Sequence, residues 1–91
     1  MRFGTFFFFQ APPWLRHDEV IHRELEQIEW SEELGFDEIW LTEHHFIDYG
    51  LSVDPTMLAA AAASRTRRVR IGLAAAILPF HHPIRVAEQL A

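Results

Sequence analysis

The chain has 91 residues, of which eight are arginine, none is lysine and 13 are acidic, so its formal net charge at neutral pH is -5. Without lysine it cannot form a Schiff base or a Walker-type phosphate loop. Without cysteine it has no disulfide, thiolate nucleophile or cysteine-ligated metal. We expect no nucleic-acid partner, because the only basic cluster, Arg65 to Arg70, is interpreted as the solvated end of a helix.

The N-terminal segment does not have the pattern of a secretory signal. Its apolar run, Phe6 to Phe9, is too short for the hydrophobic region of a signal peptide, and Pro12 and Pro13 follow in place of a cleavage site. No segment approaches the roughly 18 consecutive apolar residues of a membrane span. We therefore expect a cytoplasmic protein without a membrane partner.

Strands and helices are predicted to alternate along the chain. Residues 1–10 hold five phenylalanines and predict a strand that is buried on both faces. Residues 18–34 have apolar side chains at spacings of three and four, which predicts an amphipathic helix that begins at an Asp18 cap and ends at Gly35. A second strand is predicted over residues 36–46.

The second half of the chain repeats this alternation. Asp54 followed by Pro55 predicts the start of a helix over residues 55–66. The apolar residues 69–78 predict a third strand, and residues 83–91 begin a third helix. Strands that alternate with helices form a parallel sheet, so the predicted fold class is α/β.

The size of the chain limits which α/β fold it can form. A TIM (β/α)8 barrel needs about 250 residues, so a chain of 91 residues with about three βα units would be less than half of one. The helical pattern runs to the last residue without a cap, which favours an incomplete barrel. The alternative is a truncated, non-catalytic fragment that self-associates through its exposed sheet and its alanine-rich helix.

The second strand ends in the most polar segment of the chain, Glu43-His44-His45. Alternation along a strand places Glu43 and His45 on one side and His44 on the other. His44 is a candidate general acid or base, and the alternative is a histidine that is hydrogen-bonded to a loop carbonyl. A metal site with His81 and His82 is disfavoured, because adjacent ligands on a strand diverge and the His-Glu-x-x-His spacing is absent.

Small and aromatic residues at the other two strand ends have two interpretations each. The small residues Gly72 to Ala76 either let a flat ligand approach the backbone or pack against the first strand. Phe6 and Phe8 either line an apolar pocket or belong to the core.

The chain resembles bacterial luciferase-like flavin-dependent monooxygenases over essentially its whole length. The most specific segment is Gly35-Phe36-Asp37-Glu38-Ile39-Trp40 followed by Glu43-His44-His45-Phe46. The resemblance also includes Met1-Arg2-Phe3-Gly4, Pro12-Pro13, Tyr49-Gly50, Asp54-Pro55, Arg70-Ile71-Gly72, Leu78-Pro79 and His82-Pro83 with Arg85.

The resemblance implies that residues 1–91 are the N-terminal three βα units of a single TIM (β/α)8 barrel domain, and that the protein is an oxidoreductase that uses reduced flavin and molecular oxygen. The flavin of this family is usually FMN supplied by a separate flavin reductase, and the substrate is an aldehyde or a similar small organic molecule. A deazaflavin cofactor is the less favoured alternative. The helices at 55–66 and 83–91 resemble those that pair subunits into a dimer, which gives Glu88 an interface role.

The resemblance also implies roles at the site. His44 corresponds to the catalytic histidine that assists flavin-peroxide chemistry, and His45 beside it is structural. Ala74 and Ala75 match a non-proline cis peptide against which the isoalloxazine ring packs, and Glu43 is placed with them at the cofactor. Phe6 and Phe8 would line the substrate cavity.

Overall fold

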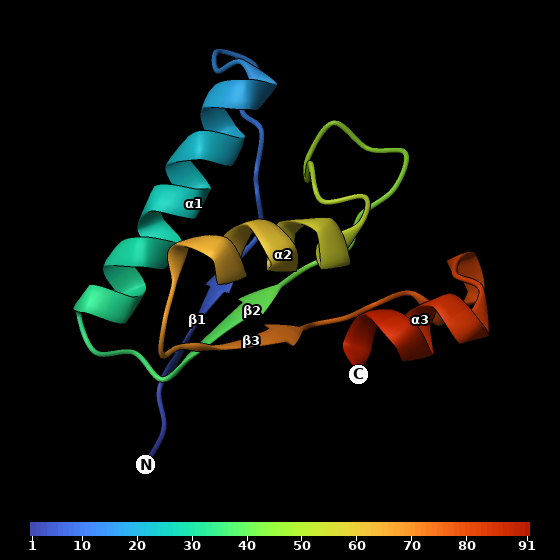
Figure 1. Ribbon diagram of the computed structural model, residues 1–91. Helices are drawn as coiled ribbons and strands as arrows, with labels where there is room; N and C mark the ends of the chain where they lie inside the picture. Colours follow the sequence, from blue (N-terminus) through green and yellow to red (C-terminus); the bar gives the residue numbers. More distant parts are fainter.

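The computed structural model describes residues 1–91 as a three-stranded sheet with helices along the chain (Figure 1). In chain order the elements are β1 (Gly4–Phe7), α1 (His17–Glu33), β2 (Glu38–Leu41), α2 (Pro55–Arg65), β3 (Arg70–Leu73), the 3₁₀ helix η1 (Leu78–Phe80) and α3 (Pro83–Leu90). The strand order is β1-β2-β3, and both pairings are parallel. The predicted α/β class is thus confirmed. None of the helices is both long and apolar enough to cross a membrane.

Each strand is shorter than its apolar run predicted, because the backbone leaves the ladder and bonds to loops. After β1, Phe9 adopts a positive φ of 51° and its carbonyl accepts the N–H of Leu51. After β2, the N–H of His44 donates to the Ser52 carbonyl at 2.7 Å. After β3, the N–H of Ala74 still donates to the Leu41 carbonyl of β2, but the pairing between the two strands ends there.

The start of α1 differs from the prediction. The helix begins at His17, so its N-cap is Arg16 and Asp18 lies inside the first turn. Asp18 instead pairs with the Arg16 guanidinium at 2.8 Å, and the Glu19 carboxylate accepts the Arg16 N–H at 3.1 Å. The prediction that Asp18 caps the helix was therefore wrong. Arg16 occupies the N-cap position, and its backbone N–H donates to the Glu19 carboxylate.

The other predicted helix ends are confirmed. Gly35 follows α1 with a φ of 94°, and its N–H donates to the Glu32 carbonyl while that of Phe36 donates to Ser31. This pair of bonds is a Schellman motif, which requires a left-handed residue. The Asp54 carboxylate caps α2 by accepting the Thr56 N–H at 2.9 Å.

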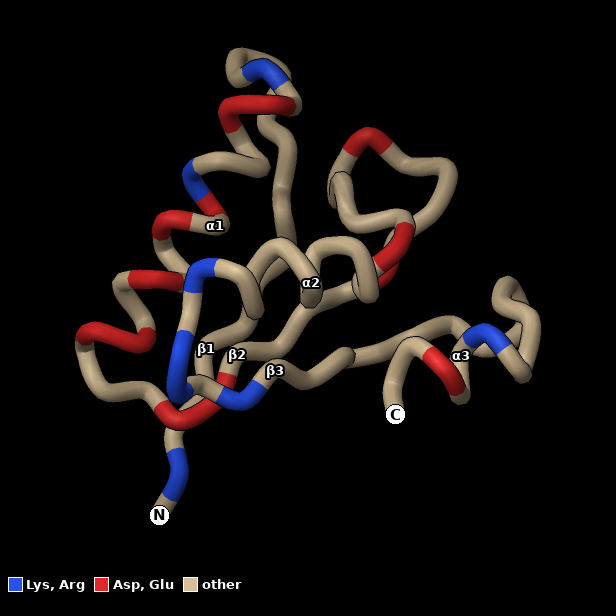
Figure 2. Tube along the Cα trace, viewed as in Figure 1, with Lys and Arg blue, Asp and Glu red and all other residues tan.

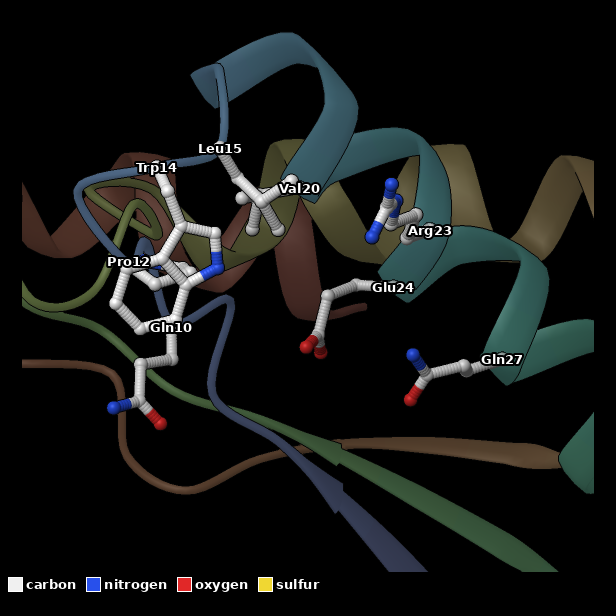
Figure 3. Close-up of a pocket in the computed structure, with 8 residues that line it drawn as sticks. All are labelled: Gln10, Pro12, Trp14, Leu15, Val20, Arg23, Glu24 and Gln27. Atoms are coloured by element: carbon white, nitrogen blue, oxygen red, sulfur yellow. The ribbon is translucent and has the colours of Figure 1, made fainter.

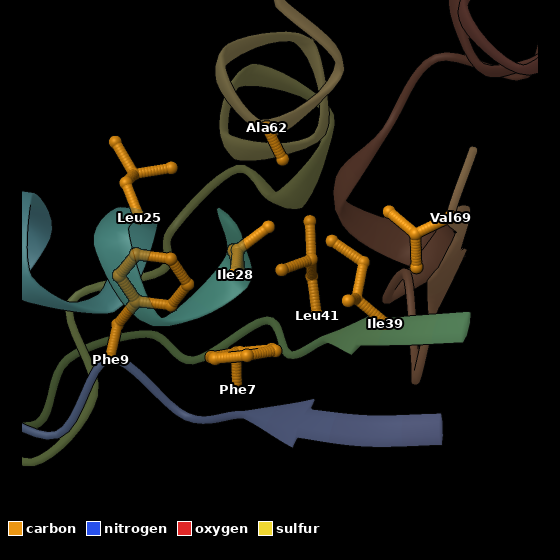
Figure 4. Packing of buried hydrophobic residues seen from close by; sticks show 8 residues of the cluster. All are labelled: Phe7, Phe9, Leu25, Ile28, Ile39, Leu41, Ala62 and Val69. Atoms are coloured by element: carbon orange, nitrogen blue, oxygen red, sulfur yellow. The ribbon is translucent and has the colours of Figure 1, made fainter. Parts of the chain in front are cut away.

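The core lies on one face of the sheet, under α1 and α2 (Figure 4). On the sheet side the buried residues of this cluster are Phe7, Phe9, Ile39, Leu41 and Val69, and they face Leu25 and Ile28 of α1 and Ala62 of α2. On the opposite face Phe6 is 56% exposed and Trp40 38% exposed. The prediction that the first strand is buried on both faces was wrong within these residues, because both helices pack on the same side.

Charged residues join α1 to the turn before β3 (Figure 2). The Glu32 carboxylate accepts the backbone N–H groups of Arg67, Arg68 and Val69. The Arg68 guanidinium donates to the Glu32 and Phe36 carbonyls. All four arginines of the cluster are exposed and Arg65 lies in the last turn of α2, which agrees with the interpretation of a solvated helix end. In addition, Arg68 bonds to the last turn of α1, through Glu32, and to Phe36 just beyond it.

Candidate functional site

The predicted site residues that follow β2 and β3 meet at one edge of the sheet, since both strands are parallel. Glu43 lies at the centre, and its side chain is 0% exposed. Its carboxylate oxygens accept the Ile77 N–H at 2.6 Å, the His45 Nε2 at 2.6 Å and the His81 Nε2 at 2.9 Å. The carboxylate thus ties the end of β2 to the segment between β3 and α3.

The environment of Glu43 keeps its carboxylate ionised. Burial raises the pKa of Glu43, but hydrogen bonds from His45, from the Ile77 N–H and from His81 outweigh burial, so the pKa lies below its ordinary value. Both imidazoles reach an ionised acceptor through Nε2, so each carries its proton there and donates it. His45 also contacts the Phe80 ring edge-on, with centroids 4.7 Å apart.

His44 points away from this cluster, as strand alternation predicted. Its imidazole packs against the Phe8 ring, with centroids 4.5 Å apart, and Phe8 in turn contacts Tyr49 at 5.2 Å. The His44 Nε2 atom is buried and has no hydrogen-bond partner. A buried ring nitrogen without a partner is exceptional in a folded protein and marks a group available to a ligand or a reacting proton.

The third strand end provides small, accessible side chains. Ala74 and Ala75 are exposed, and the peptide bond between them is cis. The space over Gly72 is occupied, because a Cβ built there would lie 2.5 Å from the Trp40 ring. A flat ligand thus finds open backbone at Ala74 and Ala75 but not at Gly72.

The predicted pocket residues line one of two hollows in the structure. The ring centroids of Phe6 and Phe8 lie 5.9 Å apart, and neither residue belongs to the core cluster. Both help to line a hollow of about 360 Å³ beside β1, at the edge of the sheet. A second hollow, of about 430 Å³, lies between the N-terminal half of α1 and the segment after β1 (Figure 3). Its lining contains none of the predicted site residues, but it includes Glu24, whose pKa is raised by burial.

The remaining candidates lie apart from the site. Glu88 is exposed on α3, where its carboxylate lies 4.0 Å from Arg85 Nη1. No group of three or more histidine, aspartate or glutamate side chains in the structure could hold a metal ion. Sequence reasoning grouped His81 with Glu43 only in the disfavoured metal site and did not predict the hydrogen bond between them, because 38 residues separate the two.

The luciferase-like monooxygenase family model matches residues 1–91. The chain belongs to this family. It is 44% identical over 92 residues to limonene 1,2-monooxygenase of Rhodococcus erythropolis, a match that covers 97% of the chain and 23% of the relative. It is 40% identical over 90 residues to an alkanal monooxygenase alpha chain of Photorhabdus laumondii, covering 99% and 25%.

Solved structures of luciferase-like TIM-barrel monooxygenases have the same fold. The monooxygenase RslO1 from Streptomyces bottropensis superposes with a TM-score of 0.91 at 39% identity, covering 100% of the chain and 28% of RslO1. The oxygenating constituent of 3,6-diketocamphane monooxygenase from Pseudomonas putida, solved with FMN, superposes with a TM-score of 0.88 at 24% identity, covering 98% and 24%. The chain therefore spans about a quarter of the length of the relatives that it matches, and its fold is that of the N-terminal units of such a barrel.

Proposed function

We propose that this chain is the N-terminal part of a flavin-dependent monooxygenase that uses reduced FMN and O2 to oxidise an aldehyde or a similar small organic substrate. The observation that best supports this is the buried, unpartnered His44 Nε2 at the carboxyl end of β2, packed against Phe8. Strand ends are where barrels of this kind gather their reactive groups. The alkanal and limonene monooxygenases among the relatives are consistent with this chemistry.

The residues present fit a flavin. Ala74 and Ala75 leave the backbone after β3 accessible to a flat ring. When bound, the reduced flavin supplies the electrons that activate oxygen. His44 would hold or move a proton at Nε2, the only buried side-chain nitrogen or oxygen atom without a hydrogen-bond partner.

The other residues have supporting roles in this proposal. Glu43 holds the segment that contains Ala74 and Ala75 in place, since it bonds the Ile77 N–H and His81 beyond it. His45 is structural, through its bond to Glu43. Phe6 and Phe8 contribute to the substrate cavity.

The whole protein is proposed to act as a cytoplasmic dimer that pairs through α2 and α3, with Glu88 at the interface. A separate flavin reductase would supply the reduced FMN. The comparisons do not favour the alternative of a non-catalytic fragment that self-associates.

The test is His44→Ala in the complete natural protein, with reduced FMN, O2 and a series of aldehydes. Loss of a general acid or base lowers turnover by roughly 10²- to 10⁴-fold, while FMN binding and circular dichroism stay unchanged. His22→Ala, an exposed histidine on α1, is the matched control and should turn over normally. Full turnover by His44→Ala, or no binding of FMN by the natural protein, would contradict the proposal.

A further inference from the structure

The loop between β2 and α2 returns to the end of β1. Gln10 and Gly50 form an antiparallel bridge. The Ala11 N–H donates to the Tyr49 carbonyl, and the Leu51 N–H donates to the Phe9 carbonyl, each at 3.0 Å. These bonds fix the backbone on both sides of Gly50 to the chain that follows β1.

The same loop is also fixed to the end of β2. The His44 N–H donates to the Ser52 carbonyl at 2.7 Å, and the Ser52 hydroxyl donates to the Thr42 carbonyl. Gly50 is buried. Its backbone is therefore held against the residue that the proposed function places at the centre of the chemistry.

Gly50 leaves no room for a side chain. A Cβ at this position would lie 2.7 Å from His44 Cδ2, 3.1 Å from Cγ and 3.3 Å from Cβ. These atoms are the root of the side chain and the adjoining edge of the ring, so a small change at the tip of a flexible chain cannot relieve the contact. Any other residue at position 50 must displace either the imidazole or the loop.

We infer that Gly50 is a positioning residue for His44, since its missing side chain lets the loop backbone close directly onto the imidazole that also packs against Phe8. The inference rests on the role proposed for His44. Contacts from the Gly50 backbone and from the Phe8 ring fix the ring plane, and so fix the direction in which the unpartnered Nε2 points. A reacting group misplaced by about 1 Å loses roughly two orders of magnitude in rate.

The test is Gly50→Ala in the complete natural protein, with Asp48→Ala as the matched control. Asp48 lies in the same loop and is exposed. We expect Gly50→Ala to shift the imidazole NMR signals of His44 and to lower kcat by about a hundredfold. Asp48→Ala should leave both the His44 signals and kcat close to those of the wild type. Unchanged His44 signals in Gly50→Ala would overturn the inference.

The two failures can be told apart. If His44→Ala turns over normally, the proposed function fails, while the NMR signals still decide whether Gly50 positions the ring. If His44→Ala is inactive but Gly50→Ala matches the wild type in kcat and signals, only the inference fails. Should Gly50→Ala not fold, Gly50→Ala combined with Phe8→Leu gives the ring more room. The His44 signals of this double variant should then differ from those of Phe8→Leu alone, and identical signals would overturn the inference.

Discussion

Replacing Glu43 by glutamine tests whether one buried carboxylate holds the site together. The wild-type side chain is fully buried and accepts three donors, from Ile77, His45 and His81. Glutamine has nearly the same shape but offers one oxygen acceptor, and its amide nitrogen only donates. At least one buried donor must therefore lose its acceptor and face the new amide nitrogen instead.

The expected loss follows from these contacts. An unsatisfied buried donor costs about 1–3 kcal/mol, and each hydrogen bond to a charged group contributes about 1.5–3 kcal/mol. We expect Glu43→Gln to lower the free energy of unfolding by about 3 kcal/mol, measured by urea denaturation at pH 7. Glu38→Gln on β2 is the matched control. It should change stability by less than about 1 kcal/mol, because the Glu38 carboxylate meets only Arg2, at 3.9 Å near the surface.

The pH dependence gives a second readout for Glu43. Since the folded pKa of Glu43 is lowered from its ordinary value of 4.5, its contribution to stability is present above that value and is lost as pH falls through the folded pKa. The difference in the free energy of unfolding between the wild type and Glu43→Gln should therefore narrow below about pH 4.5. A stability loss under about 1 kcal/mol at pH 7, or a gap that stays constant into acid, would refute the role assigned to this carboxylate.

Two further substitutions test the fold. Asp54→Ala should lower stability by about 1 kcal/mol, because the carboxylate caps α2 at the Thr56 N–H; thermal melts followed by circular dichroism should show this loss, and no loss for Asp48→Ala in the same loop. Gly72→Val should cost about 1–3 kcal/mol and shift the tryptophan fluorescence, because a Cβ there lies 2.5 Å from the Trp40 ring; an unshifted emission spectrum would contradict this packing.

Local sequence signals were sufficient for the order of the elements and for most helix ends. The Asp54-Pro55 cap and the left-handed Gly35 depend only on neighbouring residues, so they could be predicted. The strand lengths could not, since apolar runs such as 69–78 continue past the point where the backbone bonds to a loop. The cap of α1 was misplaced because Glu19 and Asp18 both suit the first turn, and only the geometry shows that Glu19 accepts the Arg16 backbone N–H while Asp18 pairs with the Arg16 guanidinium.

For the site, the sequence pattern predicted the direction of the side chains along β2 but not the contacts that loops make with them. The period of two along β2 predicted that Glu43 and His45 face one side and His44 the other, and the bonds agree. This alternation did not predict which residues the side chains on the two sides contact. His81 and Gly50 reach the site through loops whose return paths depend on long-range backbone bonds. Direction is thus encoded locally, whereas the contacts that would give His44 and Glu43 different chemistry arise only when β1, β2 and β3 are assembled.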